Sequence, residues 1–453
     1  MYHELLNLQR TYFNQGKTKD YQFRMKQLDA LYQAITNHEN LIIEALYKDL
    51  GKSSFEAYLT EIGVVKKEIK DMKKHLKSYM KLKRVEHGIA LFKAKSYLYQ
   101  EPYGQVLIIA PWNYPFQLAI APLIGAIAAG NTAMIKVSEL APHTEKVILN
   151  MIDQTFEPEY IKVITGGVKE SQALLDEPFD YIFFTGSPSV GKIIMKKASE
   201  HLTPVTLELG GKSPAIIEDL KDMALIAKRI AYGKFINAGQ TCIAPDYIYI
   251  KEELKEAFIS ELKNAIFQFF GEDPLKSEDY PKIIHQKHYD RLICLIDSKK
   301  VVFGGTYDNQ KISPTLCENV TWDDDIMKDE IFGPILPIMA YQSLDEVISV
   351  LKMKDKPLAL YLFTENKQIK KRIIQELSFG GATINDTLMH FANENLPFGG
   401  VGNSGMGQYH GKYSFSTFSH EKGVVDRSTK IDVPLRYLPT SDKKEKLVKK
   451  ILK

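Results

Sequence analysis

The sequence has few cysteines, no long apolar run and almost no net charge. Only three cysteines, at positions 242, 294 and 317, occur among 453 residues, and none belongs to a CxxC pair. An odd number without paired spacing argues against a disulfide framework and a zinc knuckle. The histidines show no HExxH or similar metal spacing. We therefore expect no metal, and a reducing, cytoplasmic environment.

The most apolar run, "LAIAPLIGAIAAG", is shorter than the roughly 20 residues that a transmembrane helix needs, and it contains Pro122. We expect a buried helix there instead. The opening stretch "MYHELLNLQRTYFNQGKTKD" is polar and amphipathic, without the basic, apolar and small-residue order of a signal peptide. The sequence predicts neither a membrane span nor secretion.

The net charge of +3 is concentrated near the C-terminus. Residues 442–453 hold six lysines against Asp442 and Glu445, a balance of +4 that leaves −1 for the rest of the chain. A neutral body lacks the basic face of a nucleic-acid-binding domain. We therefore expect no nucleic-acid partner.

The sequence does contain a long alternation of helix and strand patterns, and its length predicts two or three domains. Residues 20–80 repeat apolar side chains at helical spacing. From residue 106 short apolar runs alternate with amphipathic stretches: "VLIIA", "AMIKV", "IKVI", "YIFFT" and "VTLEL", then, after "GGKSP", "AIIE", "YIYIK", "ILPIMAY", "LALYLFT" and "GATIN". Strands that are apolar on both faces belong to parallel sheets covered by helices. The predicted fold class is α/β, with a Rossmann-like dinucleotide-binding domain, a second α/β domain and a cleft between them.

Residues 81–100 break this pattern, because polar and apolar side chains alternate with a period of two from Leu91 to Tyr99. Such alternation predicts an exposed hairpin rather than a core strand. We expect this arm to pair with another chain.

A first candidate site is the turn "FFTGSPSVGKI", where a strand runs into Gly186 and a helix begins near Ser189. Backbone N–H groups at such a turn favour a phosphate. The phosphate loop of nucleotide hydrolases needs a hydroxyl residue after Lys192, but Ile193 stands there, which argues against an ATPase. The GxGxxG fingerprint is also absent. From these residues alone, a phosphate site and a plain strand-to-helix turn both remain open.

Two polar side chains end predicted strands. Asn113, in "APWNYP", follows a parallel strand at the end where ligands bind, and its amide suits either an oxyanion donor or the cap of the next helix. Glu208 is flanked by Leu207 and Leu209, so desolvation should raise its pKa, which suits a general base near neutral pH. The alternative is a Glu208 that turns outward or pairs with a lysine.

Cys242 follows a helical pattern that ends near Asn237 and Gly239, a left-handed cap that would present the thiol on a turn. A free thiol is mostly protonated at neutral pH and needs nearby dipoles or a base for activation. Cys294, on an apolar helix stripe, and Cys317 are assigned to packing, the commonest role of a lone cysteine.

Two further segments fit a cleft without being diagnostic. "DEIFGPILP" is suited to aim Glu330 and Phe332 inward. The five glycines from residue 399 to residue 407 indicate backbone packed closely against another element.

Taken together, these segments resemble the aldehyde dehydrogenase superfamily. The wording "PWNYP", "NAGQTCIAPDY" and "LPFGGVGNSGMGQYHGKYSF" resembles its class 3, fatty and aromatic aldehyde branch, and the likeness runs from about residue 5 to residue 430. The resemblance implies Cys242 as the nucleophile, Glu208 as the general base and Asn113 as an oxyanion donor beside the Cys242 backbone N–H. It implies cofactor contacts by Lys136 and Glu139 at the adenosine ribose, Gly186, Ser187 and Gly191 at the pyrophosphate, and Glu330 and Phe332 at the nicotinamide ribose. Tyr114 and Phe398 would line the substrate pocket.

The resemblance also implies an organisation of the chain. Residues 1–80 and 101–209 would form the NAD(P)-binding domain, 210–399 the catalytic domain, 81–100 and 420–432 a bridging arm for oligomerisation, 400–419 a glycine-rich return segment, and 433–453 a basic tail. Class 3 enzymes are typically dimers, so a homodimer is expected.

The implied function is oxidation of an aldehyde to a carboxylate through a cysteine thiohemiacetal and a thioester. Because Glu139 favours a ribose 2′-hydroxyl, NAD is the expected cofactor, with NADP accepted by some class 3 relatives. Medium- or long-chain aliphatic and aromatic aldehydes are the expected substrates. The alternatives are a coenzyme A-acylating dehydrogenase of the same fold, against which Glu208 argues, and a non-catalytic nucleotide-binding protein.

The resemblance ends at the C-terminal segment. Some class 3 members carry a hydrophobic membrane anchor, whereas this chain has "SDKKEKLVKKILK", with apolar side chains on one helical face among lysines. The pattern fits weak, peripheral contact with an anionic membrane surface, or a solvated tail.

Overall fold

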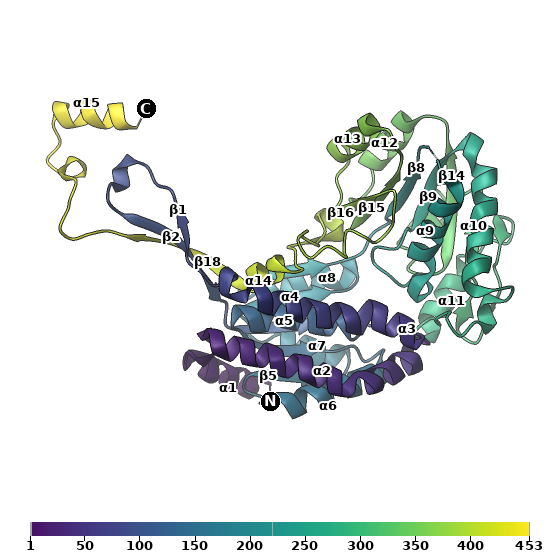
Figure 1. Ribbon diagram of the computed structural model, residues 1–453, viewed down its shortest axis with the longest axis horizontal. Coiled ribbons are helices and arrows are strands. Elements are labelled where there is room, and N and C mark those ends of the chain that lie inside the picture. The colour runs from purple at the N-terminus through teal and green to yellow at the C-terminus, as the bar shows by residue number, and fades with distance from the viewer. Residues whose placement is uncertain (1, 220, 453) are drawn as a thin grey trace.

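Two largely parallel sheets and a three-stranded arm organise the protein, which the computed structural model describes over residues 2–219 and 221–452 (Figure 1). The first sheet has the order β17-β7-β6-β3-β4-β5, and its strands are β3 (Gln105–Ile109), β4 (Thr132–Lys136), β5 (Ile161–Ile164), β6 (Tyr181–Thr185), β7 (Val205–Glu208) and β17 (Gly405–Met406). All pair in parallel except β17, which returns from the glycine-rich segment and runs antiparallel to β7. The predicted parallel sheet is confirmed.

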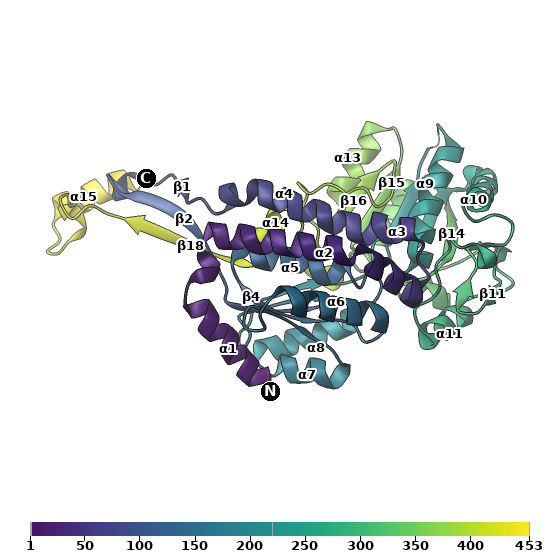
Figure 2. The ribbon, with the colours of Figure 1, turned by 60° about the horizontal axis from the view of Figure 1, so that its bottom comes forward.

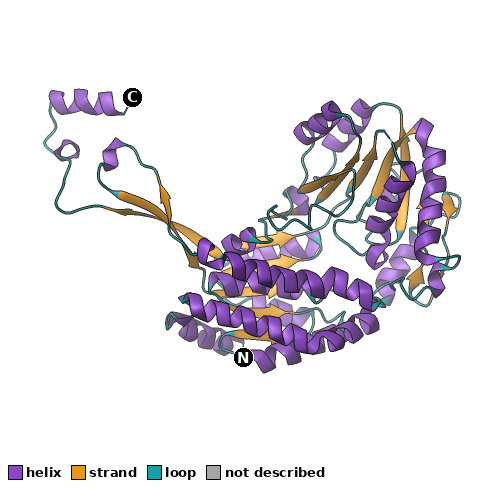
Figure 3. Ribbon diagram, viewed as in Figure 1, coloured by secondary structure: helices purple, strands orange, loops and turns teal. Residues whose placement is uncertain are grey.

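Helices cover both faces of this sheet (Figure 3). One face carries α1 (Tyr2–Asn14), α7 (Val168–Leu175) and α8 (Pro188–Ser199), and the other carries α2 (Tyr21–Leu50), α4 (Gly63–Tyr79), α5 (Gln117–Ala129) and α6 (Pro142–Thr155). Successive strand residues point to opposite faces, so Leu107 joins the first layer and Val106 the second. Every residue of α5 is buried, which confirms the expected buried helix.

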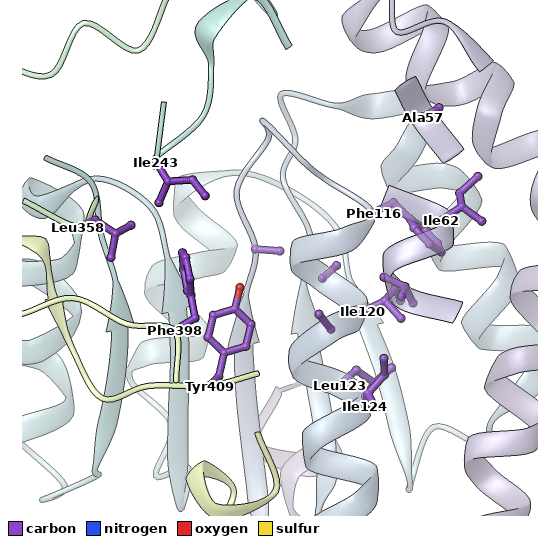
Figure 4. Packing of buried hydrophobic residues seen from close by; sticks show 14 of the residues in the cluster. Ala57, Ile62, Phe116, Ile120, Leu123, Ile124, Ile243, Leu358, Phe398 and Tyr409 are labelled. Atoms are coloured by element: carbon purple, nitrogen blue, oxygen red, sulfur yellow. The ribbon is translucent and has the colours of Figure 1, made fainter. Parts of the chain in front are cut away.

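The second sheet has the order β10-β13-β14-β9-β8-β15-β16. Its strands are β8 (Pro214–Ile217), β9 (Tyr247–Lys251), β10 (Val301–Phe303), β13 (Thr315–Cys317), β14 (Ile335–Tyr341), β15 (Ala359–Phe363) and β16 (Gly381–Ile384), and only the β10–β13 pairing is antiparallel. One face carries α9 (Met223–Phe235) and α10 (Lys255–Phe270); the other carries α11 (Gln286–Cys294), α12 (Leu344–Lys352) and α13 (Lys367–Glu376). A single buried cluster continues from α5 to this sheet, and Figure 4 shows Phe116 and Ile120 across from Ile243 and Leu358.

The arm consists of β1 (Lys83–Val85), β2 (Lys95–Pro102) and β18 (Ser419–Asp426), paired antiparallel, and it projects away from the rest of the protein (Figure 2). The exposed hairpin is confirmed. Beyond β18, none of the described residues from 427 to 452 is buried. The last helix, α15 (Asp442–Ile451), lies near the tip of the arm in both views. No helix in the described part of the chain is long and apolar enough to span a membrane.

The two cysteines assigned to packing behave differently. Cys317 is buried in β13, as expected, but Cys294 is exposed, so its assignment is wrong. The buried stripe of α11 is His288, Tyr289 and Leu292, and Cys294 lies off that stripe at the end of the helix.

Candidate active site

The carboxyl end of the first sheet faces the amino end of the second across a cleft of about 930 Å³. Seven of the predicted site residues line this cleft: Asn113, Gly186, Ser187, Glu208, Cys242, Glu330 and Phe332. The other five, which lie elsewhere, are Tyr114, Lys136, Glu139, Gly191 and Phe398.

The turn that carries the thiol is built from left-handed backbone. Helix α9 ends at Phe235, earlier than the sequence indicated, and Asn237, Ala238 and Gly239 then have φ of 52°, 49° and 74°. Two non-glycine residues in this region are costly and need tertiary support. A Cβ on Gly239 would lie 2.4 Å from the carbonyl oxygen of Gly333, so only glycine fits there. This turn presents Cys242, half-buried, to the cleft.

Asn113 is joined to the thiol turn by hydrogen bonds. Its Nδ2 donates to the carbonyl of Gln240 at 3.0 Å. The Nδ2 of Asn237 donates to the carbonyls of both Asn113 and Gln240, at 2.8 and 3.1 Å. The N-cap of α5 is Phe116 and not Asn113, so the capping alternative is wrong. Because an amide nitrogen carries two hydrogens, Asn113 keeps one for a ligand in the cleft.

A buried ion pair that no sequence motif indicates supports the Asn113 segment. Lys52, just after α2, donates to Glu61 of the π-helical turn η2 (Tyr58–Ile62) at 2.5 Å and to the Asn113 carbonyl at 3.2 Å. Both charged side chains are fully buried. The second carboxyl oxygen of Glu61 accepts from the N–H groups of Phe116 and Gln117, at 2.9 and 3.2 Å, and thereby caps α5.

Glu208 ends β7 inside the protein, with 2% of its surface exposed. Neither carboxyl oxygen has a hydrogen-bond partner among the described residues, so the outward-facing and lysine-paired alternatives are wrong. Burial raises the pKa of Glu208 well above its ordinary value, the direction that the sequence indicated.

Two carboxyl groups, those of Glu330 and Glu208, act on the pKa of the Cys242 thiol. Burial raises the pKa of Cys242, and the charges of Glu330 and then Glu208 raise it further. Hydrogen bonds from the backbone N–H groups of Cys242 and Ile243 act in the opposite direction. The resting thiol is therefore protonated at neutral pH, and a neighbouring carboxyl can take its proton only when that carboxyl is ionised.

Glu330 lies against the turn that follows Glu208. A Cβ on Gly210 would be 2.0 Å from a Glu330 carboxyl oxygen, and the Gly211 N–H hydrogen-bonds to this carboxylate. Burial and then the charge of Asp246 raise the pKa of Glu330 to about 8.

Phe332, in the same loop, has a left-handed φ of 53°. Its ring meets Trp112 edge to face, with centroids 5.3 Å apart at 85°. The Nε2 of His288 donates to its carbonyl at 2.8 Å. Burial lowers the pKa of His288 to about 4, so this histidine is neutral. Sequence reasoning missed both Trp112 and His288, because their roles depend on contacts between distant segments.

The N-terminus of α8 opens into the cleft beside Gly186 and Ser187. Ser187 caps the helix by accepting from the Val190 N–H at 3.4 Å. A Cβ on Gly186 would lie 2.4 Å from the Phe184 ring, so the turn stays free of a side chain. Such a helix start suits a pyrophosphate. Gly191 lies elsewhere, against Leu209, where a Cβ would be 2.8 Å from that side chain and would push α8 away.

Lys136 and Glu139 lie at the carboxyl end of β4, with Lys136 Nζ 3.3 Å from a Glu139 carboxyl oxygen. Lys136 is buried, whereas 41% of the Glu139 side chain is exposed. A buried cation beside an accessible carboxylate offers both a donor and an acceptor to a ribose. Together with the start of α8, these residues fit a dinucleotide.

The two predicted pocket residues lie in different surroundings. The Tyr114 hydroxyl is 2.6 Å from Thr241 Oγ1, next to the thiol, and Lys52 Nζ is 4.0 Å from the centre of its ring. Phe398 lies in the buried cluster, stacked on His390 at 6.0 Å and beside Tyr409 (Figure 4). Tyr114 thus hydrogen-bonds to a neighbour of the thiol, whereas Phe398 belongs to the buried cluster against which Cys242 packs.

Three comparisons bear on this arrangement. A family model described as "Aldehyde dehydrogenase family" matches residues 6–424. The 4,4'-diaponeurosporen-aldehyde dehydrogenase of Staphylococcus aureus is 53% identical over 98% of this chain and 97% of its own length. The dimeric NADP-preferring aldehyde dehydrogenase of Mus musculus is 45% identical over 94% of each. The solved substrate-bound state of Staphylococcus aureus AldH superposes with a TM-score of 0.98, at 52% identity over 100% of both chains.

Proposed function

The chain belongs to the aldehyde dehydrogenase family and oxidises aldehydes with NAD or NADP, and from this premise we propose that Cys242, Asn113 and Glu208 convert an aldehyde to a carboxylate. The observation that carries the proposal is that all three line one cleft, with the Asn113 amide already bound to the thiol turn.

In the first step the Cys242 sulfur adds to the aldehyde carbon after its proton passes to a neighbouring carboxylate. The aldehyde oxygen takes the negative charge as the thiohemiacetal forms. The free hydrogen of the Asn113 amide and the Cys242 backbone N–H donate to this oxygen, and one such donor contributes roughly a hundredfold or more to the rate.

The residues that would hold the cofactor come from three elements. Gly186 and Ser187, at the start of α8, would bind the pyrophosphate, and Lys136 with Glu139 the adenosine ribose. Glu330 and Phe332 would contact the nicotinamide ribose. When bound, the nicotinamide ring accepts the hydrogen and two electrons that leave the substrate carbon. We assign Gly191 a packing role, because its lack of a side chain lets α8 lie close to Leu209.

In the last step Glu208 removes a proton from water, and the resulting hydroxide attacks the thioester carbonyl. The carboxylate product leaves as the C–S bond breaks and the thiol is restored. A buried carboxyl with a raised pKa suits this role. A coenzyme A-acylating enzyme has no need of such a base, so Glu208 favours hydrolysis over acyl transfer.

For substrates, we propose medium- or long-chain aliphatic or aromatic aldehydes. Tyr114 and the buried cluster around Phe398 give the thiol apolar and aromatic surroundings, and the relative from Staphylococcus aureus is named for a diaponeurosporen aldehyde. A panel of aldehydes from short aliphatic through long-chain to aromatic tests this choice by kcat/KM.

For the cofactor, we propose a preference for NAD. Glu139 is accessible beside Lys136, and at the proposed ribose position its charge would repel a 2′-phosphate. The Mus musculus relative is described as NADP-preferring, so kcat/KM must be compared for both cofactors. A strong NADP preference would show that Glu139 does not face the ribose.

For the assembly, we propose a cytoplasmic homodimer joined through the arm formed by residues 81–100 and 420–432. The arm sheet projects from its own subunit, and the same relative is described as dimeric.

For the organisation of the chain, we propose that residues 1–80 and 101–209 form the domain that binds the cofactor. Residues 210–399 would form the domain that carries the catalytic thiol, and residues 400–419 would return between the two domains. Residues 433–453 would contact anionic membrane surfaces.

The proposal is tested with purified Cys242→Ala, assayed for NADH formation with a reactive aldehyde. Activity should be abolished, because the variant lacks the nucleophile. Cys294→Ala is the matched control, since Cys294 is the exposed cysteine outside the cleft, and it should retain wild-type activity. An active Cys242→Ala enzyme would overturn the proposal.

A further inference from the structure

The loop that carries Glu330 is held almost entirely through its backbone. Charged and polar side chains from other segments bind its consecutive carbonyl groups. The bonds are Lys212 to the carbonyl of Asp329 at 2.9 Å, Arg291 to those of Glu330 at 3.4 Å and Ile331, and His288 to that of Phe332 at 2.8 Å. The direction of the Glu330 side chain therefore depends on groups outside its loop.

The ion pair between Lys212 and Asp246 lies at the centre of these contacts. Its charged atoms are 2.5 Å apart, and the two side chains are 14% and 4% exposed. Lys212 also binds the carbonyl of Ile326 at 3.0 Å, while Asp246 accepts from the N–H of Ile331 at 2.9 Å. The pair thus holds peptide groups on both sides of Glu330.

Each partner of this pair follows one of the two catalytic turns. Lys212 comes directly after the Gly210–Gly211 turn that follows the base Glu208, and Asp246 comes four residues after Cys242. The Asp246 N–H donates to the Ser213 carbonyl at 2.8 Å, which joins the two turns. A movement of the pair would therefore shift the base, the thiol and Glu330 together.

We propose that Lys212 and Asp246 are positioning residues that hold the Glu330 carboxylate against Gly210 and beside Cys242, and so set the reactivity of the nucleophile. The inference rests on the proposed role of Cys242. The side-chain hydrogen bonds of Lys212 and Asp246 among the described residues go to each other and to backbone groups, and none goes to the Cys242 sulfur. The carboxylate lies within the volume that a Gly210 Cβ would fill, so a loosened loop has room to swing only away from this turn.

The variant Lys212→Met separates positioning from simple electrostatics. Loss of a nearby cation by itself raises the pKa of a thiol and slows its alkylation. Release of the Glu330 carboxylate from the thiol has the opposite effect, because its charge raises the pKa of Cys242. Because Lys212 also lowers the pKa of Glu330, which is about 8, alkylation is measured at pH 10, where Glu330 is ionised with or without Lys212. We therefore expect Lys212→Met to accelerate alkylation of Cys242 by iodoacetamide at this pH by roughly threefold or more, the equivalent of about half a pKa unit.

The measurement is made on cofactor-free full-length protein in a Cys294→Ser background, because Cys294 is exposed and would react as well. Labelling of the peptide that contains Cys242 is followed by mass spectrometry. In a Glu330→Gln background the acceleration should vanish, and Lys212→Arg should restore the wild-type rate. Lys300→Met is the matched control, since Lys300 pairs with Asp324 at 2.6 Å in a partly buried site whose two side chains do not line the cleft.

Slower or unchanged alkylation in folded Lys212→Met overturns the inference, and so does an acceleration that persists without Glu330. If Lys212→Met does not fold, as judged by its circular dichroism and thermal transition, Lys212→Ala, which also lacks the donor, is read in the same way. Alkylation needs no turnover, so the result stands apart from the proposed function, which fails instead if the wild type oxidises no aldehyde.

Discussion

The side-chain amide of Asn113 donates a 3.0 Å hydrogen bond to the backbone carbonyl of Gln240, two residues before Cys242. This bond joins the end of a strand in the first sheet to the thiol turn of the second. The amide is thus oriented before any substrate arrives. Donors fixed in advance cost no reorganisation when charge develops, which is the condition for strong stabilisation of an oxyanion.

Replacement of Asn113 by alanine should lower kcat by about a hundredfold to a thousandfold, the cost of one oxyanion donor. Steady-state rates at saturating aldehyde and NAD measure this effect. Binding of NAD, followed by fluorescence titration, should stay within about twofold of wild type, because the role proposed for the amide is a contact with the aldehyde oxygen and not with the cofactor. A kcat within a few-fold of wild type would assign the oxyanion to other donors.

Replacement of Glu208 by glutamine should leave acylation intact and slow hydrolysis. We expect a rapid burst of NADH, about one equivalent per active site, followed by slow turnover, because an accumulating acyl-enzyme is the sign of covalent catalysis. Stopped-flow absorbance measures both phases. A variant that loses the burst along with turnover would place the essential work of Glu208 before the thioester, and not after it.

Removal of one partner of the buried Lys52–Glu61 pair should strongly destabilise the fold. Lys52→Met leaves the Glu61 charge uncompensated in a fully buried site, which costs about 3–5 kcal/mol. The free energy of unfolding is measured by urea denaturation. Lys48→Met is the matched control: Lys48 pairs with Glu44 at the same 2.5 Å distance, but on the surface, where such a pair contributes about 0–1 kcal/mol. Equal losses in both variants would contradict this assignment.

Glu56 should make stability depend on pH. Its carboxyl accepts the Asn237 N–H at 2.9 Å, and burial raises its pKa from 4.5 to about 7. Between these values the unfolded chain releases the proton while the folded protein retains it, so this group's contribution to the free energy of unfolding falls as pH rises from 4.5 to about 7 and levels off above that.

The variant Glu56→Gln lacks this titration. Its stability relative to wild type should therefore rise by about 2 kcal/mol between pH 5.5 and pH 8, from the share of the pKa difference that lies in this interval. Urea denaturation at the two pH values, followed by circular dichroism, measures the difference. A constant or falling difference would show that Glu56 stays ionised in the folded protein.

Removal of residues 442–453 should weaken binding to anionic vesicles without changing activity. Helix α15 exposes Leu447 and Ile451 among its lysines, and a basic amphipathic helix of this kind binds anionic surfaces. Co-sedimentation with vesicles of phosphatidylserine and phosphatidylcholine measures the effect, and vesicles of phosphatidylcholine alone are the control. Binding that is unchanged by the truncation would leave the tail as a solvated segment.

Local patterns were sufficient to predict most elements of the fold. Continuous apolar runs such as "VLIIA" and "YIFFT" lie in β3 and β6, because a strand that is buried on both faces needs apolar side chains on both. The period-two arm and the buried α5 followed in the same way. Cys294 shows where this reasoning fails: an apolar neighbourhood in the sequence does not say which side of a short helix faces the core.

For the candidate site, the sequence determined which side chains end strands and turns, since Asn113, Glu208 and Cys242 each follow a recognisable apolar or helical segment. Only the tertiary structure decided how these residues meet. The Lys212–Asp246 pair, the Lys52–Glu61 pair and the bridging amide of Asn237 join segments far apart in the chain, and no local pattern encodes such contacts. Secondary structure depends mainly on neighbours along the chain. The orientation of a buried charged side chain depends on every group that takes the place of the water around it, and these groups come from distant segments.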